Sequence, residues 1–452
     1  MVHLNSRSPW TGAELARIAA HAPDEAAAVI GALVEQFPVW RRDHRLRWSA
    51  LERFATVLGE ARSGIVDLLV REAGKNRIDA EAEADLLPRK IAISLGAGLA
   101  RTPQTLGQGT EPQPLWRPRG VAVVLGPFNF PLHLLHGLVV PALAVGCTVA
   151  AKPSERCPAL GALYGGLLAA AGLDAVCRVV LGGAEMAQAL IAQPAVATVA
   201  AVGGRSTGIA LAQALSHRPE VVLALELGGV NPALVLDDGD LASAASAIAD
   251  GAWRMAGQRC TATRQVHVSR ARYHGLVEAL KQERLRWLPD GTAGGASGAM
   301  IDAPARERFL RALAAAPPGL ARLAGDPTRR FGDSCCVEPM LMAVNDRSAR
   351  DHALYREELF GPGLIVDPYD DLDDCVARLA ANPYRLAAAV FTASRERFLA
   401  LAPRLAYGQV NHNRPTAGAR SDQPFGGLGQ AGNARPAALA AGAIFADESV
   451  VW

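Results

Sequence analysis

Three things are scarce in this sequence: aromatic residues, lysine and long uninterrupted hydrophobic runs. Aromatic residues make up 5% of the 452 positions. The longest apolar stretch, residues 132–149, is interrupted by histidine, glycine and proline, which predicts no membrane-spanning helix. The segment Met1–Pro9 lacks the hydrophobic core of a signal peptide. We therefore expect a cytoplasmic protein with no membrane partner.

Charge and metal-binding patterns exclude further classes of protein. Lys and Arg total 46 against 44 Asp and Glu, a net charge of +2, so no general surface for nucleic acid is expected. The seven cysteines are an odd number scattered along the chain, which favours reduced thiols over a disulfide framework. No histidine pair has metal-ligand spacing beside a carboxylate. We interpret His133 and His136 as structural and expect no metal.

Lysine is so rare that 42 of the 46 basic residues are arginine. Where a general positive charge is sufficient, this chain uses arginine. A retained lysine is therefore more informative than usual. The four lysines are Lys75, Lys90, Lys152 and Lys281.

What the sequence does contain is an alternation of short β-rich runs and Ala/Leu-rich helical segments. Amphipathic helices are predicted first, at residues 24–37, 46–60 and 65–73. From residue 120 onward, predicted strands alternate with predicted helices. The strands are 121–125, 148–151, 178–181, 196–202 and 221–225, and the helices are 132–144, 159–171, 184–191 and 207–216. This spacing is typical of an α/β fold with a doubly wound parallel sheet.

A second alternating series predicts a second α/β lobe. Its strands are 233–236, 265–269, 387–391 and 408–411, and its helices are 241–255 and 273–283. The Arg-rich stretch 306–330 is interpreted as a solvated helical face. The stretch 101–119, rich in Thr, Gln, Gly and Pro, interrupts the first lobe and predicts a protruding β-arm. We therefore predict two domains. The first lobe consists of residues 1–100 and 120–227, and the second of residues 228–436.

Ligands of open parallel sheets bind beyond the carboxyl ends of the strands, which directs attention to the residues that follow each strand. Cys260 lies in a polar turn, Gly257-Gln258-Arg259-Cys260-Thr261, which would lower the thiol pKa and expose a thiolate nucleophile. Glu226 ends a strand before two glycines and is a candidate general base. Asn129, in a loop with a proline on each side, is a candidate oxyanion donor. The alternatives are a buried apolar cysteine, an ordinary glutamate and a turn-capping asparagine.

Two further strand ends carry candidate cofactor contacts. Lys152 ends a strand, and with Glu155 it could bind the ribose of a nucleotide. The second end is the segment Gly203-Gly204-Arg205-Ser206-Thr207-Gly208, which opens a helix after a strand and could face a pyrophosphate. This segment matches neither the dinucleotide fingerprint nor a P-loop, so a simple turn is the alternative.

Taken together, these motifs resemble the aldehyde dehydrogenase superfamily over essentially the whole chain. Within it, the closest resemblance is to the succinylglutamate-semialdehyde dehydrogenases of arginine catabolism, supported by 90–94, 126–131 and 432–436. Six motifs carry the family resemblance, in the family's order: 127–131 (PFNFP), 152–155 (KPSE), 226–229 (ELGG), 257–260 (GQRC), 357–362 (EELFGP) and 424–427 (PFGG).

The resemblance implies a role for each matched residue. Cys260 would be the nucleophile, Glu226 the base that activates water, and Asn129 with the Cys260 backbone amide the oxyanion hole. The cofactor implied is NAD, with NADP not excluded, and the remaining matched residues would bind it. Lys152 and Glu155 would contact the adenosine ribose, 203–208 the pyrophosphate, Glu358 the nicotinamide ribose and Phe360 the nicotinamide. The fold implied adds a small β oligomerisation element at 101–119 and 437–452, hence a homodimer or homotetramer.

One departure from the family pattern concerns the cofactor. The family usually has Phe-Thr-Gly-Ser where this chain has Ala-Val-Gly-Gly at 201–204, so the Ser hydroxyl is replaced by Gly204, with Arg205 beside it. The substrate we expect is a small, carboxylated aliphatic aldehyde such as succinylglutamate semialdehyde, with Arg414 and Arg420 as candidate cations for its tail. The alternatives are a specialised biosynthetic or acylating (thiol-accepting) aldehyde dehydrogenase and, from another class, a cofactor-impaired oligomeric scaffold or binding protein.

Overall fold

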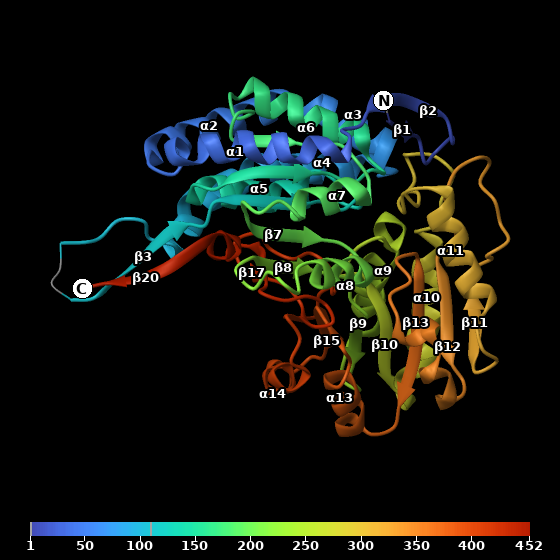
Figure 1. Ribbon diagram of the computed structural model, residues 1–452. Helices are drawn as coiled ribbons and strands as arrows, with labels where there is room; N and C mark the ends of the chain where they lie inside the picture. The colour runs from blue at the N-terminus through green and yellow to red at the C-terminus, as the bar shows by residue number, and fades with distance from the viewer. Residues whose placement is uncertain (1, 109–110) are drawn as a thin grey trace.

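The computed structural model describes residues 2–108 and 111–452 of the chain. Met1 lies outside the described residues. So do residues 109–110, which belong to the predicted arm. Two parallel sheets dominate the structure, one in each half of the chain, and a two-stranded arm projects from them (Figure 1). Among the described residues, no helix has the length and apolar composition to cross a membrane.

The first sheet is five-stranded and wholly parallel, in the order β6-β5-β4-β7-β8. Every residue of β4 and β5 is buried, as expected for strands covered on both faces. The chain order reverses between β4 and β7, the position where open α/β sheets bind ligands. The strands are β4 (Val121–Leu125), β5 (Thr148–Lys152), β6 (Cys177–Val179), β7 (Val196–Val202) and β8 (Val222–Glu226).

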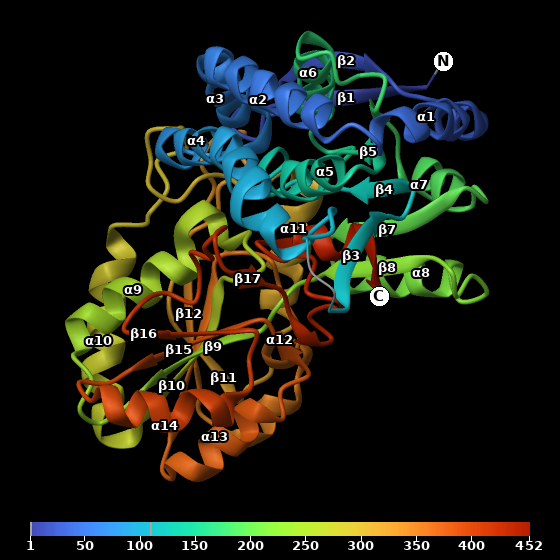
Figure 2. The same cartoon turned by 90° about the vertical axis from the view of Figure 1, so that its left-hand side faces the viewer.

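Helices cover both faces of this sheet. On one face, alternate strand residues pack against α5 (His133–Val145) and α6 (Pro158–Ala170). On the other face they pack against α1 (Ala26–Trp40), α7 (Ala184–Ile191) and α8 (Arg205–Ala214). An outer helical layer lies over α5 and α6 (Figure 2). It consists of α2 (His44–Glu60), α3 (Arg62–Ala73) and α4 (Arg77–Ile93).

Two elements of the first half have no counterpart in the sequence-based prediction. A hairpin of β1 (His3–Arg7) and β2 (Glu14–Ala19) begins the chain. Helix α4 is the other. It buries Asp79, Glu83 and Lys90 along with its apolar residues. Because charged residues normally mark the solvent face of a helix, these three obscure its amphipathic pattern.

The second sheet has seven strands in the order β11-β12-β13-β10-β9-β15-β16, and β11 alone pairs antiparallel. Helices α9 and α10 pack on one face, and α13 and α14 on the other. The strands are β9 (Asn231–Val235), β10 (Thr263–Ser269), β11 (Leu320–Ala324), β12 (Met340–Val344), β13 (Gly363–Tyr369), β15 (Ala387–Phe391) and β16 (Gln409–His412). The helices are α9 (Leu241–Trp253), α10 (Tyr273–Leu285), α11 (Ala303–Ala314), α12 (Ala353–Arg356), α13 (Leu372–Ala380) and α14 (Arg395–Leu405).

The prediction of one helical face over residues 306–330 is wrong. Helix α11 ends at Ala314, and the edge strand β11 follows after a turn that contains Pro317 and Pro318. Proline lacks the N–H that a helix needs for its hydrogen bonds, which explains why α11 does not continue through this turn. The prediction also omitted β12 and β13.

The arm pairs β3 (Gln113–Pro118) with β20 (Ala446–Val451) over six antiparallel residue pairs. It extends away from both sheets in Figure 1. The segment before β20 stays on the body of the protein. There β19 (Ala437–Ala438) pairs with β17 (Pro424–Phe425), and the turn Ala441–Phe445 packs on α5. Beside it, β14 (Tyr384–Arg385) pairs with β18 (Leu428–Gly429).

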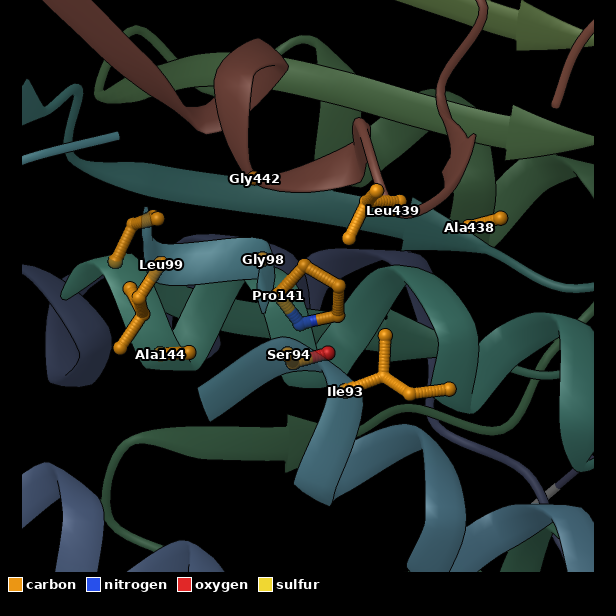
Figure 3. A pocket seen from close by; sticks show the side chains of 10 residues that line it. Ile93, Ser94, Gly98, Leu99, Pro141, Ala144, Ala438, Leu439 and Gly442 are labelled. Carbon is orange, nitrogen blue, oxygen red and sulfur yellow. The ribbon is translucent and has the colours of Figure 1, made fainter. Parts of the chain in front are cut away.

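A small cavity lies where this C-terminal segment covers the helices. Leu439 and Gly442 face Ile93 and Ser94 from the end of α4 and Pro141 from α5 (Figure 3). Its volume of about 10 Å³ is roughly the room one water needs. None of the residues that line it is a candidate site residue, so the cavity reflects packing.

Candidate active site

The carboxyl ends of the first sheet's strands lie side by side along one edge. The backbone N–H of Gly126 donates to the carbonyl of Lys152 (2.9 Å), and that of Gly203 donates to the carbonyl of Glu226 (3.0 Å). The four segments 126–131, 152–155, 203–208 and 226–229 therefore begin at this edge, as parallel strand pairing requires.

Glu226, the last residue of β8, is fully buried. Burial raises the pKa of its carboxyl to about 8, the adjacent Cys260 thiol opposes the shift by hydrogen bonding, and Glu358 adds to it. Apart from that thiol, neither carboxyl oxygen has a partner within the described part of the chain. A buried carboxyl with so few partners favours its neutral form, and its carboxylate form therefore holds a proton more tightly than an ordinary glutamate does.

Cys260 is half-buried and follows a sharp kink after α9. Met255, Ala256 and Gly257 all have positive φ values, of 56°, 51° and 66°. A Cβ on Gly257 would overlap the carbonyl oxygen of Gly361, so only glycine fits there.

The expectation that this turn lowers the thiol pKa is wrong. Burial raises the pKa of Cys260 well above its usual value, and the carboxyls of Glu226 and Glu358 add to the rise. The residues beside Cys260 in the sequence are mostly polar, but burial and two carboxyl groups from distant parts of the chain raise its pKa. The resting group is therefore a thiol that faces carboxyl groups.

Asn129 reaches the cysteine turn from the other side. Its side-chain Nδ2 donates a hydrogen bond to the carbonyl of Gln258 (2.9 Å), which fixes the amide and leaves the second N–H for another acceptor. The Cys260 carbonyl accepts a bond from Asn231 Nδ2 (2.7 Å), so the backbone of the turn is also anchored. Glu226, Cys260 and Asn129 thus converge on one place.

The two glycines after Glu226 permit a close approach of Glu358. A Cβ on Gly228 would overlap the Glu358 carboxyl, while the N–H of Gly229 donates to Glu358 Oε1 (3.2 Å). Burial raises the pKa of Glu358 to about 7, and Arg264, 3.9 Å from Oε1, opposes the shift. Glu358 therefore comes from the second half of the chain to the same site.

Phe360 lies close by. Its ring meets Phe128 of the Asn129 loop edge to face, with the centroids 5.7 Å apart. Its φ of 47° is unusual for a residue other than glycine, so the surrounding contacts must hold it in place. The two rings join the first and second halves of the chain at an apolar surface beside Glu358.

The remaining candidate cofactor residues lie along the first sheet's edge. Lys152 is buried, and its Nζ lies 3.2 Å from Oε2 of the half-exposed Glu155. At the start of α8, Arg205, Ser206 and Thr207 are exposed. Gly204 is the N-cap of α8 and offers no side-chain cap, so the first N–H groups of the helix have no side-chain acceptor there.

The two candidate substrate arginines differ in their surroundings. Arg414 is exposed, on a segment joined to the cysteine turn by the bond from Thr416 Oγ1 to the Thr261 carbonyl (2.7 Å). Arg420 is also exposed, but its guanidinium forms two bonds to Asp422, one of them 2.9 Å long. The charge of Arg420 is therefore already matched.

The sequence analysis missed three residues that build this site. Arg264 donates to the carbonyls of Gly361 and Gly257 (2.7 Å each) and faces Glu358. Asn231 holds the Cys260 carbonyl, and Gln258 uses both ends of its amide on the backbone of 299–301. Arg264 is buried in β10, where only Val266 and Val268 are apolar, so no pattern in the strand marked it. Bonds to backbone carbonyls leave no motif in the sequence.

Comparison with known proteins shows the family of the chain. The model of the Aldehyde dehydrogenase family matches residues 2–445. An N-succinylglutamate 5-semialdehyde dehydrogenase of Caulobacter vibrioides is 37% identical, with 96% of this chain and 93% of that protein covered. The corresponding protein of Cronobacter sakazakii is 35% identical, with 92% and 86% covered.

Solved structures show the same fold. A gamma-glutamyl-gamma-aminobutyraldehyde dehydrogenase from Burkholderia cenocepacia superimposes with a TM-score of 0.92 at 27% identity, covering 99% of this chain and 92% of that one. An indole-3-acetaldehyde dehydrogenase solved with NAD⁺ gives 0.92 at 26% identity, covering 100% and 93%. The chain therefore belongs to the aldehyde dehydrogenase family and is an oxidoreductase that acts on aldehydes.

Proposed function

We propose that the protein catalyses the NAD-dependent oxidation of a small, carboxylated aliphatic aldehyde, similar to succinylglutamate semialdehyde, through a thioester on Cys260. The observation that carries the proposal is the buried Glu226 carboxyl beside the Cys260 thiol. The relatives named above support the choice of substrate class.

The first step is activation of the thiol. The Cys260 thiol gives its proton to the Glu226 carboxylate, whose pKa of about 8 makes it a matched acceptor. The thiolate attacks the aldehyde carbon, so a C–S bond forms and the carbonyl π electrons move to oxygen. The second N–H of Asn129 and the backbone N–H of Cys260 stabilise that oxygen.

The residues at the strand ends fit a nicotinamide dinucleotide. Lys152 and Glu155 offer a cation and a half-exposed carboxylate for a ribose diol, and the uncapped start of α8 offers N–H groups for a pyrophosphate. Glu358 and the Phe128–Phe360 pair would border the nicotinamide ribose and ring. When bound, the dinucleotide supplies the acceptor for the hydride that leaves the former aldehyde carbon.

The last step is hydrolysis of the thioester. Before this step Glu226 loses to solvent the proton that it took from Cys260. The Glu226 carboxylate then takes a proton from a water molecule, the resulting hydroxide attacks the acyl carbon, and the C–S bond breaks, which releases the acid and leaves a Cys260 thiolate that recovers a proton from Glu226. This role of Glu226 disfavours transfer of the acyl group to an external thiol, because an adjacent water-activating base would hydrolyse the thioester first.

The pyrophosphate contact is where this chain departs from its family. A Cβ at Gly204 would meet no atom within 4 Å, so the backbone there is open to a ligand. Arg205 lies near Tyr384 of the second half of the chain: burial raises the pKa of Tyr384, and the Arg205 charge opposes the shift. We propose that the Arg205 guanidinium replaces the family's serine hydroxyl on the pyrophosphate.

The substrate tail is assigned to Arg414 rather than Arg420. Arg414 is exposed and lies two residues before Thr416, which bonds to the cysteine turn, whereas Arg420 is bonded to Asp422. A carboxylate on the aldehyde would therefore meet Arg414.

The arm of β3 and β20 is proposed as an oligomerisation element. It projects from the body (Figure 1), and Val450 and Trp452 are exposed. The molecular mass in solution tests whether the protein is a homodimer or a homotetramer. The same measurement on a chain truncated after Phe445 tests whether the arm is needed for that assembly. An unchanged assembly would reject the arm's role.

The test of the function is a panel of semialdehydes with NAD and NADP. Reduced cofactor should form with the wild-type protein, fastest with carboxylated substrates, and not with Cys260→Ala. Mass spectrometry after a rapid quench should find the acyl group on Cys260. Equal activity of Cys260→Ala would remove the cysteine from the mechanism, and equal rates with Arg414→Ala on acidic and neutral aldehydes would reject the substrate assignment.

A further inference from the structure

Lys75 and Glu83 form an ion pair inside the protein that the proposed mechanism does not use. The Lys75 Nζ lies 2.8 Å from Glu83 Oε2, and the two side chains are 2% and 0% exposed. Lys75 follows the left-handed Gly74 that ends α3, and Glu83 lies in α4. Burying two charges is unfavourable unless each finds close partners, so the contacts of this pair are informative.

Glu83 fixes the end of the Asn129 loop. Its second oxygen, Oε1, accepts hydrogen bonds from the backbone N–H groups of Leu132 (3.1 Å) and His133 (2.9 Å). These N–H groups lie at the start of α5, directly after the loop 127–131, and lack partners within the helix. The negative charge also suits the positive end of the helix dipole.

Lys75 contacts both catalytic loops at once. Its Nζ lies 3.9 Å from the centroid of the Phe130 ring and 3.8 Å from the Met255 sulfur. Phe130 is the residue after Asn129, and Met255 lies in the left-handed kink that leads to Cys260. A single ammonium group therefore joins the oxyanion loop to the cysteine turn through a cation–π contact and a sulfur contact.

The Asn129 loop is held from two sides. Phe128 packs against Phe360, Phe130 packs against Lys75, and Asn129 between them donates to the Gln258 carbonyl. A shift of Phe130 would therefore move Asn129. Lysine is scarce in this chain, which agrees with a specific need for the compact ammonium of Lys75 rather than for any positive charge.

We propose that Lys75 and Glu83 are positioning residues for the oxidation, which hold the Asn129 amide and the Cys260 turn at their working separation. They touch no reacting atom and act through Phe130, α5 and Met255. This inference rests on the proposed function of Asn129 and Cys260.

The expected effect is on turnover and not on binding. Displacing a catalytic group by about 1 Å lowers the rate by roughly 10²-fold, so Lys75→Met and Glu83→Gln should each reduce kcat by about that factor. The KM for the aldehyde and the Kd for NAD, measured by tryptophan fluorescence, should stay within about threefold, because neither residue lies at the proposed binding positions.

A double-mutant cycle with Asn129 gives the sharpest test. If Lys75 acts through Asn129, then Lys75→Met should lower kcat by less than about threefold in the Asn129→Ala background. Additive losses would overturn the proposal, because they would mean that Lys75 and Asn129 act independently.

Controls separate positioning from stability. The exposed pair Lys281–Glu278 has the same 2.8 Å separation, so Lys281→Met with Glu278→Gln is the matched control and should leave kcat unchanged. The double variant Lys75→Met/Glu83→Gln removes both charges and avoids an unpaired one, so it should fold even if a single variant does not. A folded double variant with wild-type kcat would overturn the proposal.

A measurement that needs no turnover distinguishes failure of the positioning proposal from failure of the proposed function. Cys260 is the one half-buried cysteine among seven, so its alkylation by iodoacetamide can be followed by mass spectrometry. In Lys75→Met the alkylation rate should change by at least about threefold, and in the Lys281 control it should not. An unchanged rate overturns the positioning role even if the wild type oxidises every aldehyde tried, whereas a wild type that oxidises none overturns the proposed function instead.

Discussion

Two pairs of neighbouring glycines lie at the same edge of the first sheet, and they differ in what surrounds them. Gly228 and Gly229 follow β8 in a crowded turn: a Cβ on Gly228 would overlap the Glu358 carboxyl, and one on Gly229 would lie 2.6 Å from Asn231 Oδ1. Gly203 and Gly204 follow β7 in an open turn. A Cβ on Gly203 would make only ordinary contacts with Thr207, and one on Gly204 would meet nothing within 4 Å.

The difference shows that glycine has two uses at this site. After β8 the absent side chains make room for other parts of the protein, so Glu358 and the Cys260 turn can approach Glu226. After β7 they leave backbone open to a ligand. Burial follows the same division: Glu226 is fully buried, whereas Arg205 and Ser206 are exposed. Substitutions in the crowded turn should therefore have large effects and those in the open turn small ones.

The largest effect is expected at Glu226, the residue that leads from β8 into the crowded turn. Glu226→Gln preserves shape and removes the base, so kcat should fall by about 10²–10⁴-fold. In the wild type the carboxyl must be ionised to accept a proton, so kcat should rise with pH up to about 8 and then level off. The pH–rate profiles of the two proteins test this. If kcat of Glu226→Gln also rose with pH up to about 8, the rise would belong to another ionisable group.

Stability should respond to pH in the opposite sense at the same residue. The folded-state pKa of Glu226, about 8, lies above its ordinary value. Its favourable contribution is therefore complete below the unfolded pKa and is lost as the pH rises through about 8. Glutamine does not ionise, so Tm of Glu226→Gln relative to the wild type should be higher at pH 9 than at pH 6. A pH-independent difference in Tm would contradict the buried, unpaired carboxyl.

Gly228→Ala should come next. The added methyl would displace the Glu358 carboxyl, which is the end of a flexible side chain, so the free energy of unfolding should fall by only about 1–2 kcal/mol. The affinity for NAD should fall more, by about 10–100-fold, because a charged hydrogen-bond partner is lost. Titration of tryptophan fluorescence with NAD and a denaturation curve measure the two. Weakening of stability without weakening of NAD binding would mean that Glu358 does not contact the cofactor.

The smallest effects are expected at Gly204. Gly204→Ala should change Tm by less than about 2 °C, because the position is exposed and open. Gly204→Ser adds an N-cap hydroxyl and should alter NAD affinity by no more than about threefold while Arg205 is present. In an Arg205→Ala background the same serine should strengthen binding by a larger factor. Equal effects in both backgrounds would show that Arg205 does not replace the hydroxyl.

Sequence patterns predicted the strands of the first sheet to within about two residues, because these buried β-rich runs alternate with helices in a regular way. The rule that ligands bind at strand ends also selected four segments that the structure brings to one edge of the sheet. The sequence could not reveal α4, whose buried Asp79, Glu83 and Lys90 contradict the usual polar face. Antiparallel pairing at the edge of the second sheet, β11 with β12, was missed because each strand is short and isolated in the sequence.

The error over the Cys260 pKa has a different cause. The residues next to Cys260 in the chain are polar, but its pKa is raised first by burial and then by Glu226 and Glu358, which lie 34 positions before it and 98 after it. Electrostatic effects act through space, and a local sequence window does not contain them. For the same reason Arg264 and Asn231, which bind backbone carbonyls, left no motif.

The C-terminal stretch 431–433 returns to the first sheet and runs beside β8. Asn433 exchanges hydrogen bonds with the backbone of Leu223 and Leu225, and Gly432 forms a bridge with Glu226. During synthesis on the ribosome this support reaches β8 only after about 200 further residues, roughly 10–40 s later. The nascent chain can therefore build most of its first lobe early, but the strand that ends in Glu226 gains this support only when residues 431–433 leave the exit tunnel.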